Sequence, residues 1–421
     1  MTDAPVARRV HRLLRRRAGE TLVLVLAGGE GGRLGLLTDH RAKPMTPVAG
    51  TLRMVDVPLS HCMHAGLEDV WLVHQYRAHG LAEYLRNGRP WDLDRSHGGL
   101  LLLGPSTGEE GAGWHTGNAD AIWRNRALIA EVAPRDVLVV SADHLYRMDY
   151  REVLAAHRSG GAALTMVTVE VRGDDPSRFG VVESDGDGRV TGFSYKPDAP
   201  RTRIVTTEVF AYATEPLLAA LAQLAGEAGP EGLSDFGDGL VPRLVEAGEV
   251  REHRYTGYWR DLGTITSYWR AHRELLADPD LLDLDDPERP FVGGDEGRPP
   301  ARLQRGARVD DCLVAPGCRI AGTVSGSVLA PGVVVEEGAE VRDAVLLQDV
   351  VVERGARVAG VIADMRARIG AGARVGAPPP GDAGEQDLVL VALEGLVHPG
   401  ARLPPGTRVP RPAGGDRALA V

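Results

Sequence analysis

The sequence has little cysteine and no long apolar run, and both absences narrow what the protein can be. Three cysteines occur in 421 residues, and Cys62, Cys312 and Cys318 are too few and too widely spaced for a disulfide framework or a zinc site. No stretch approaches the ~20 consecutive apolar residues that a membrane-spanning helix needs. We therefore predict a protein of a reducing compartment, the cytoplasm, with no membrane partner.

Net positive charge is also missing. The formal net charge is −10 at pH 7, whereas a protein that binds duplex nucleic acid needs a basic face that replaces the counterions of the phosphates. We therefore expect no nucleic-acid partner. An acidic protein still binds smaller phosphate compounds where a few of its basic residues converge.

The N-terminus carries a basic stretch at 8–17, followed by the short apolar run 22–26. This order loosely resembles a twin-arginine export signal. The apolar run is short, however, and leads directly into a glycine-rich segment with no small-residue cleavage site. We interpret residues 1–20 as a basic N-terminal helix or extension rather than as an export signal.

The length exceeds what one hydrophobic core usually organises, which favours two domains. Between 21 and 276, short buried-strand patterns alternate with longer helical ones. The predicted strands are 22–26, 70–73, 137–140 and 164–169, and the predicted helices are 59–65, 119–132 and 150–159. Such alternation predicts an α/β domain with a Rossmann-like, mostly parallel sheet, whose ligands bind at the carboxyl ends of the strands. Residues 277–300, rich in Asp, Glu, Pro and Gly, are predicted to be a linker.

The region 301–421 has a different pattern. Aliphatic residues recur every six positions with glycine or alanine between them: Leu329, Val335, Val341 and Leu347, then Val352 and Val358, then Ile369 and Val375. No aromatic residue occurs in 301–376. One aliphatic residue in six predicts a β-helix whose coils stack these side chains, followed by a C-terminal tail. Another kind of glycine-rich β structure is the alternative.

Two basic residues accompany a glycine-rich loop after the first predicted strand. The loop glycines, whose backbone N–H groups suit close approach to phosphates, are Gly28, Gly29, Gly31 and Gly32. Arg33 can add a charge-assisted hydrogen bond, and Lys43, held before Pro44, can supply a second charge. The loop lacks the Gly-Lys-Ser/Thr ending of an NTPase and the acidic residue of a dinucleotide site. A solvated lysine in a turn is the alternative for Lys43.

The order Gly-Gly-x-Gly-x-Arg-Leu and then Lys-Pro resembles the opening signature of the sugar-phosphate nucleotidylyltransferases. Further segments resemble the bacterial glucose-1-phosphate adenylyltransferases of that superfamily: 53–62, 75–76, 117–121, 143–146, 179–181, 234–237 and 258–264. The resemblance runs in order from Thr21 to Gly376. It implies a nucleotidyltransferase domain followed by a left-handed parallel β-helix of hexapeptide repeats, assembled as a homotetramer.

The implied reaction transfers the adenylyl group of ATP to glucose 1-phosphate for glycogen or α-glucan synthesis. The attacking phosphate is already ionised near neutral pH, so catalysis is positioning and charge neutralisation. The resemblance assigns catalysis to Arg33, Lys43, Asp143 and Asp261, with Mg²⁺ on Asp143 and Asp261. It assigns the nucleotide to Gly28, Gly29, Gly31, Gly32, Gln75, Gly117 and Asp120. It assigns the sugar phosphate to His115, Gly180, Tyr195, Lys196, Thr206 and Asp235.

Departures from the family pattern gather at the sugar. Tyr195 replaces the glutamate of the usual Glu-Lys-Pro, and Thr206, Glu208 and Phe210 stand at a usual serine, glycine and tyrosine. His115 stands where an aromatic hydroxyl is common. Two alternatives therefore stay open. One is a transferase for another sugar 1-phosphate or another nucleotide, and the other is a catalytically weak regulatory paralogue.

Regulation is implied by the same resemblance. Arg41 and Arg53 match basic residues near the family's effector site, which predicts a small-molecule allosteric effector there. His40 and Glu30 stand at positions that are basic in some relatives. No particular effector is therefore predicted.

Overall fold

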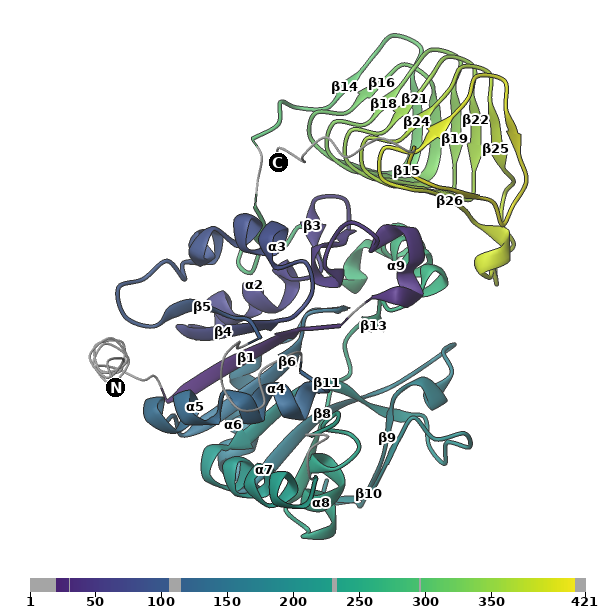
Figure 1. The fold of residues 1–421 in the computed structure, drawn as a ribbon. Helices are drawn as coiled ribbons and strands as arrows, with labels where there is room; N and C mark the ends of the chain where they lie inside the picture. Colours follow the sequence, from purple (N-terminus) through teal and green to yellow (C-terminus); the bar gives the residue numbers. More distant parts are fainter. Residues whose placement is uncertain (1–19, 30, 106–114, 229–232, 295–296, 413–421) are drawn as a thin grey trace. The chain divides into compact units, whose positions relative to one another are not determined.

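The computed structural model describes residues 20–29, 31–105, 115–228, 233–294 and 297–412 (Figure 1). The chain divides into two compact units. The first unit holds the described residues up to Gly29, together with Val57–Ala142 and Tyr146–Trp259. The second unit holds the described residues of Glu30–Asp56, Asp143–Leu145 and Arg260–Val421. The predicted N-terminal basic helix lies outside the described residues, apart from Glu20.

A nine-stranded sheet forms the centre of the first unit. Strand β1 (Thr21–Ala27) lies between β4 (Asp69–His74) and β6 (Asp136–Ser141) and is parallel to both, and β5 (Gly99–Leu103) continues the parallel order beside β4. Every residue of β1 is buried. Burial on both faces explains why the strand is apolar throughout rather than alternating.

The other half of this sheet is built differently. Strand β11 (Ile204–Ala213) runs antiparallel to β6, to β8 (Leu164–Glu170) and to β9 (Gly180–Ser184). Strand β10 (Val190–Tyr195) is antiparallel to β9, and β12 (Val250–Arg254) is parallel to β8. The predicted α/β class with a mostly parallel sheet is confirmed. The sequence pattern could not predict which strands run antiparallel, because a buried strand is apolar in either direction.

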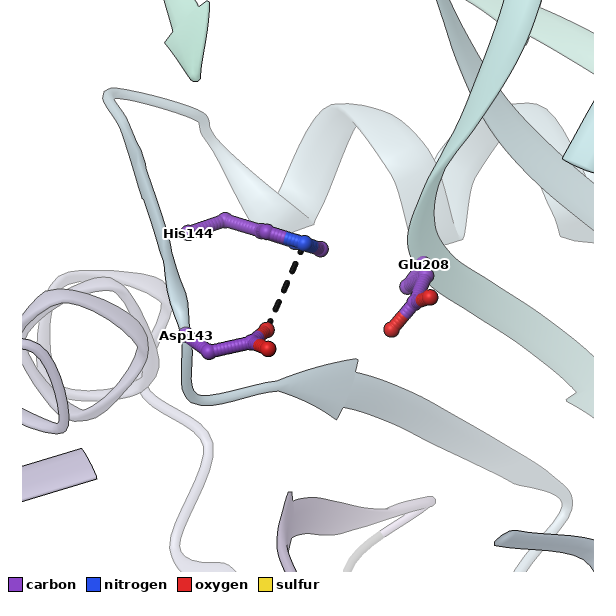
Figure 2. A group of neighbouring side chains, drawn as sticks. All are labelled: Asp143, His144 and Glu208. Carbon is purple, nitrogen blue, oxygen red and sulfur yellow. Dashed lines mark ion pairs between the residues drawn. The ribbon is translucent and has the colours of Figure 1, made fainter. Parts of the chain in front are cut away.

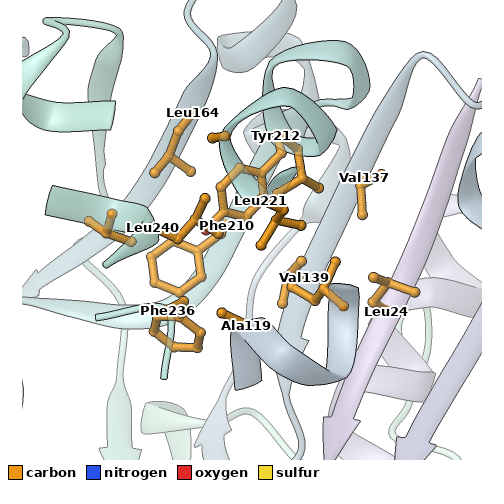
Figure 3. Packing of buried hydrophobic residues seen from close by; sticks show 14 of the residues in the cluster. Leu24, Ala119, Val137, Val139, Leu164, Phe210, Tyr212, Leu221, Phe236 and Leu240 are labelled. Atoms are coloured by element: carbon orange, nitrogen blue, oxygen red, sulfur yellow. The ribbon is translucent and has the colours of Figure 1, made fainter. Parts of the chain in front are cut away.

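Helices of the first unit cover this sheet and close its core, whereas α9 belongs to the second unit. Their bounds are α2 (Asp56–Ala65), α3 (Ala78–Leu85), α4 (Asn118–Arg124), α5 (Arg126–Val132), α6 (Tyr150–Gly160), α7 (Thr214–Ala228), α8 (Leu240–Glu246) and α9 (Ile265–Ala277). Figure 3 shows Phe210 and Tyr212 of β11 packed among Leu221 of α7 and Leu240 of α8. This cluster holds α7 and α8 against the sheet.

The prediction of one helix over 119–132 was wrong. The helix breaks at Asn125, whose φ of −95° and ψ of 7° are not helical. The Asn125 amide donates a hydrogen bond to the carbonyl of Ala121 at 2.8 Å. An asparagine side chain competes with the backbone in this way, so it ends α4 before α5 begins.

Short elements complete the first 300 residues: β2 (Pro47–Val48), β3 (Leu52–Arg53), β7 (His144–Tyr146), β13 (Trp259–Asp261), η1 (Gly32–Leu37), η2 (Lys43–Met45), η3 (Arg86–Trp91), η4 (Pro176–Arg178) and η6 (Pro279–Leu281). Strands β7 and β13 form a two-stranded sheet. None of the helices among the described residues has the length and apolar character required to cross a membrane.

The C-terminal region is a left-handed parallel β-helix, as predicted (Figure 1). Its elements are β14 (Arg302–Leu303), β15 (Arg308–Val314), β16 (Arg319–Ile320), β17 (Thr323–Leu329), β18 (Val334–Val335), β19 (Glu340–Arg342), β20 (Val345–Leu346), β21 (Val351–Val352), β22 (Arg357–Ala359), β23 (Val361–Ala363), β24 (Arg368–Ile369), β25 (Arg374–Gly376), η7 (Glu385–Asp387), β26 (Val389–Val391), β27 (Leu396–Val397), β28 (Arg402–Leu403) and β29 (Arg408–Val409).

Each coil stacks three aliphatic positions on those of the next coil. Val324 pairs with Val341 and Val341 with Val358, so successive coils here are seventeen residues apart. The strict six-residue spacing was therefore wrong at one corner, which is one residue shorter. Leu346, not Leu347, pairs with Leu329 and belongs to the internal core. The coil containing η7 is longer, because Ala363 pairs with Val391.

Candidate functional site

The glycine-rich loop joins β1 to η1 through a left-handed turn. Gly31 has a φ of 75°, and a Cβ built there would lie 3.0 Å from Thr38 Cγ2 and 3.2 Å from Lys43 Cβ. A side chain at this position would therefore strain the backbone and crowd its neighbours. Gly29 and Gly32 are exposed, so their backbone can be approached closely. Thr38 Oγ1 donates to the carbonyls of Gly31 and Gly35 at 2.9 and 3.1 Å, which closes the loop on itself.

Lys43 is buried rather than solvated. Its side chain is 8% exposed, and its Nζ atom lies 2.5 Å from Asp143 Oδ2. Burial by itself would lower the pKa of Lys43, but the carboxylates of Asp143 and Asp261 outweigh it and raise the pKa. Lys43 therefore keeps its positive charge inside the protein. Because η2 begins with Lys43-Pro44, the rigid proline helps to hold that charge in place.

Two carboxylates converge on one imidazole in the second unit. Asp143 directly precedes β7, and Asp261 ends β13. The Nε2 atom of His144 lies 3.3 Å from Asp143 Oδ1 and 4.0 Å from Asp261 Oδ1. Figure 2 shows the ring of His144 directed at the Asp143 carboxylate; Glu208, also drawn there, belongs to β11 in the first unit. The sequence assignment left out His144, although it adjoins Asp143 in the 143–146 segment.

The neighbouring backbone positions Asp261. Its Oδ1 atom accepts a hydrogen bond from the Gly263 N–H at 2.8 Å. A Cβ built on Gly263 would lie 2.8 Å from that same oxygen and 3.3 Å from Arg33 Nη2. Arg33, Lys43, Asp143 and Asp261 thus meet in the second unit. The two carboxylates offer hard oxygen ligands, a donor set that fits a divalent cation such as Mg²⁺.

Gln75 and Asp120 shape the backbone of the first unit rather than reaching out from it. Gln75 accepts a hydrogen bond from the His115 N–H at 2.6 Å and donates to its carbonyl at 3.2 Å. Asp120 is 2% exposed and accepts from the Thr116 N–H at 3.0 Å and from Arg124 Nε at 2.7 Å. Burial lowers the pKa of His115. These bonds fix the 115–117 segment.

Gly117 carries the next contact. A Cβ there would overlap the backbone of Ser234 and Asp235, so no other residue fits without a shift. The N–H of Asn118 donates to Asp235 Oδ1 at 3.1 Å. The segment predicted to line the nucleotide is therefore packed directly on the segment that holds Asp235.

A chain of polar contacts links the predicted sugar residues. Lys196 Nζ donates to the Tyr195 hydroxyl at 2.8 Å, and this hydroxyl donates to Asp235 Oδ2 at 3.1 Å. Burial, followed by the charges of Asp235 and Glu208, raises the pKa of Tyr195 far above its usual value. Tyr195 is therefore a neutral hydrogen-bond donor between a cation and a carboxylate.

The comparisons with known proteins agree with this chemistry. Residues 22–278 match the family model described as nucleotidyl transferase, and residues 299–397 match the one described as GlmU-like, C-terminal hexapeptide. A glucose-1-phosphate adenylyltransferase of Thermomicrobium roseum is 41% identical over 300 residues, which cover 71% of this chain and 70% of that protein. The enzyme of the same name from Thermotoga maritima is 37% identical over 77% of each chain. The one from Desulforamulus reducens is 36% identical over 77% of this chain and 81% of its own.

The chain belongs to the glucose-1-phosphate adenylyltransferase family. The resemblance seen in the sequence is thereby confirmed, and the chain is a nucleotidyltransferase. Enzymes of this kind typically use a divalent metal. The roles of the individual site residues stay predictions.

Two of the departures from the family pattern have different structural settings. Phe210 is 0% exposed and packs edge-on against Phe236 at a ring distance of 4.8 Å, so it belongs to the core. Glu208 lies where the strand register shifts between Thr206 and Phe210, and its φ is 58°. This conformation costs a non-glycine residue about 1–2 kcal/mol, which explains why glycine suits the position.

Thr206 of β11 and Gly180 of β9 lie next to each other on paired strands. A Cβ on Gly180 would lie 2.9 Å from Thr206 Cγ2 and 2.8 Å from the ring of Phe193. Thr206 Oγ1 accepts a hydrogen bond from the Glu208 N–H at 3.2 Å. The threonine therefore supports the bulge that carries Glu208.

Both predicted effector arginines are engaged within the second unit. Arg41 pairs with Asp364 at 2.8 Å, and its guanidinium also donates to the carbonyl of Leu37 at 3.0 Å. Arg53 donates to the carbonyl of Met45 at 3.0 Å. Glu30, at the other predicted effector position, lies outside the described residues.

Proposed function

We propose that the protein transfers the adenylyl group of ATP to glucose 1-phosphate, giving ADP-glucose and pyrophosphate. The observation that carries this is the ion pair between the buried Lys43 and Asp143, beside Asp261, in a chain of the glucose-1-phosphate adenylyltransferase family. The product would serve glycogen or α-glucan synthesis.

The phosphate chemistry follows from fixed charges. A sugar-phosphate oxygen attacks the α-phosphorus of ATP, and pyrophosphate leaves. In our proposal Arg33 and Lys43 bind the triphosphate and neutralise charge that builds up on the leaving group. The N–H groups of the loop that contains Gly28, Gly29, Gly31 and Gly32 hold the phosphates in line. No side chain is needed as a general base.

Asp143 and Asp261 would hold the cation, which we propose to be Mg²⁺. The bound ion would neutralise phosphate charge during the transfer. Lys43 offsets the Asp143 charge, and both carboxylates lie near the same imidazole. In our proposal His144, whose Nε2 atom lies near both carboxylates, helps to orient them.

In the first unit, Lys196 would bind the phosphate of the sugar 1-phosphate, while Tyr195, Asp235 and Thr206 would bind its hydroxyl groups. Gly180 would permit close approach of the sugar. Gln75 and Gly117 would shape the nucleotide pocket through the 115–117 backbone. Asp120 would act indirectly, because its carboxylate is occupied by Thr116 and Arg124.

A second candidate keeps the reaction but changes the sugar 1-phosphate or the nucleotide. Tyr195 and Glu208 favour it, since a phenol replaces a carboxylate and a strained glutamate is added. A weak regulatory paralogue is disfavoured by the intact set of Arg33, Lys43, Asp143 and Asp261. The homotetramer, the effector near Arg41 and Arg53, and the cytoplasmic location remain parts of the proposal.

Pyrophosphate release from a panel of nucleoside triphosphates and sugar 1-phosphates tests the assignment. We expect ATP with glucose 1-phosphate to give the highest kcat/KM. A higher value for another pair would establish the second candidate, and no release from any pair would support the paralogue.

A further inference from the structure

A buried ion pair ties the segment after the phosphate loop to the β-helix. Arg41 lies between η1 and η2, two residues before Lys43. Its Nη2 atom lies 2.8 Å from Asp364 Oδ1, and the two side chains are 10% and 1% exposed. Asp364 occupies the corner between β23 and β24. The Asp364 side chain of the β-helix therefore contacts the segment between η1 and η2.

Hydrogen bonds continue from this pair into the loop. Arg41 Nη1 donates to the carbonyl of Leu37, the last residue of η1, at 3.0 Å. The next residue, Thr38, donates to the carbonyls of Gly31 and Gly35. A guanidinium is planar and rigid, so its two bonds fix the position of the η1 backbone relative to Asp364. Arg33 lies within η1.

The carboxylate depends on Arg41 for its charge compensation. Asp364 Oδ1 also accepts a hydrogen bond from the Met365 N–H at 2.6 Å. Its Oδ2 atom is buried and has no hydrogen-bond partner among the described residues. A buried ion pair contributes little net stability, because desolvation offsets the attraction between the charges. What such a pair supplies here is a defined geometry.

We propose that Arg41 and Asp364 are positioning residues for the transfer reaction: through Asp364, the β-helix holds the segment that bears Arg33 and Lys43 in its reactive conformation. This inference rests on the proposed function. Transfer that depends on positioned charges is sensitive to small displacements, since a shift of about 1 Å costs on the order of 100-fold in rate.

The test compares Asp364→Asn with a matched control, Asp343→Asn. Asp343 also lies in the β-helix and pairs with Arg273 of α9 at 3.0 Å, but among the described residues neither side chain forms a hydrogen bond or ion pair with η1 or η2. We expect Asp364→Asn to speed amide hydrogen exchange across 32–43 by about tenfold or more. We expect its kcat to fall by at least about tenfold while the KM for glucose 1-phosphate changes by less than about twofold. Asp343→Asn should do neither.

Two further variants keep the result decisive. Should Asp364→Asn not fold, the paired replacement of Arg41→Met with Asp364→Leu removes both charges at similar volume and should fold. It should show the same exchange and kcat changes. Arg41→Lys keeps the positive charge, so its kcat should lie between that of the wild type and that of the paired replacement.

Unchanged exchange in 32–43, an unchanged kcat, or equal effects of Asp343→Asn would overturn the proposal. Wild-type protein that releases no pyrophosphate would overturn the proposed function instead. Amide hydrogen exchange of Asp364→Asn, compared with that of Asp343→Asn, would then still decide whether Asp364 holds residues 32–43 in place.

Discussion

The two units hold different kinds of candidate site residue. In the second unit, Arg33, Lys43, Asp143 and Asp261 all match the family pattern, and Lys43 and Asp261 are nearly buried. In the first unit, Tyr195 and Glu208 depart from the pattern and lie in half-buried positions. Charges that act on phosphates must be fixed and compensated by one another, so changing one disturbs the rest. Contacts to sugar hydroxyls are weaker and more separable, so they tolerate substitution.

Removing the β-helix should affect the second unit most. A chain that ends at Pro287 lacks Asp364 and the strands against which α9 packs. We expect loss of activity and of the assembled state, because the α9 face would be left uncovered and the coils that we propose help to build the oligomer would be gone. Size-exclusion chromatography and pyrophosphate release measure both. A truncated chain that is soluble, fully active and unchanged in oligomeric state would contradict the expectation.

Asp143→Asn should lower kcat by about 10³-fold, since it removes a cation ligand and the charge that faces Lys43. The fold should survive, because the amide keeps the shape of the carboxylate. Turnover across a magnesium titration checks this, with Asp92→Asn at an exposed position as the control. Near-wild-type turnover at saturating magnesium would show that Asp143 is not a ligand.

His272 should make the second unit sensitive to acid. Burial lowers the pKa of His272 to about 4 from 6.5. Its Nε2 accepts a hydrogen bond from the Ala49 N–H at 3.2 Å, and its Nδ1 lies 2.8 Å from the carbonyl of Tyr268, a pattern that requires the neutral ring. Because the folded state binds this proton less readily than the unfolded state, stability is lost as the pH falls from 6.5 towards 4. The full loss is about 3 kcal/mol.

Thermal unfolding from pH 7 to pH 4 measures that loss. The variant His272→Gln should flatten this dependence of the thermal stability on pH. An unchanged slope in His272→Gln would contradict the assignment.

Tyr195→Phe should sharpen the contrast between the units. It removes the hydroxyl that joins Lys196 to Asp235 but keeps the ring packed on Gly237. The KM for glucose 1-phosphate should rise about 5- to 10-fold, as expected for one lost hydrogen bond. The KM for ATP should stay within about twofold. Equal changes in both values would mean that the two sets of residues do not act separately.

Glu208→Gly carries the smallest expected change in stability. Glycine adopts the φ of 58° without strain, so the free energy of unfolding should rise by about 1 kcal/mol. Equilibrium denaturation measures this. If Glu208 has taken over sugar contacts from position 195, the same variant will bind glucose 1-phosphate at least about tenfold more weakly. Unchanged sugar binding would leave Tyr195 as the departure that matters.

The sequence pattern was sufficient to predict those structural features that depend on residues close together along the chain. The apolar run of β1, the glycine at position 31 and the aliphatic spacing of the β-helix each report local burial or backbone conformation. They predicted the α/β domain, the loop and the β-helix. Which aspartates are candidates for the cation came instead from the resemblance to the family.

Only the tertiary structure decided which residues share a unit and which charges compensate each other. Arg41 and Asp364 are 323 positions apart and Lys43 and Asp143 are 100 apart, and no local pattern joins them. Nor could spacing show that Phe210 faces the core, that Glu208 sits on a bulge, or that one corner of the seventeen-residue coils is a residue short. The reason is physical: burial, charge pairing and strand register depend on the partners that folding brings together. The sequence identified the candidate residues, but only the structure showed which groups surround them.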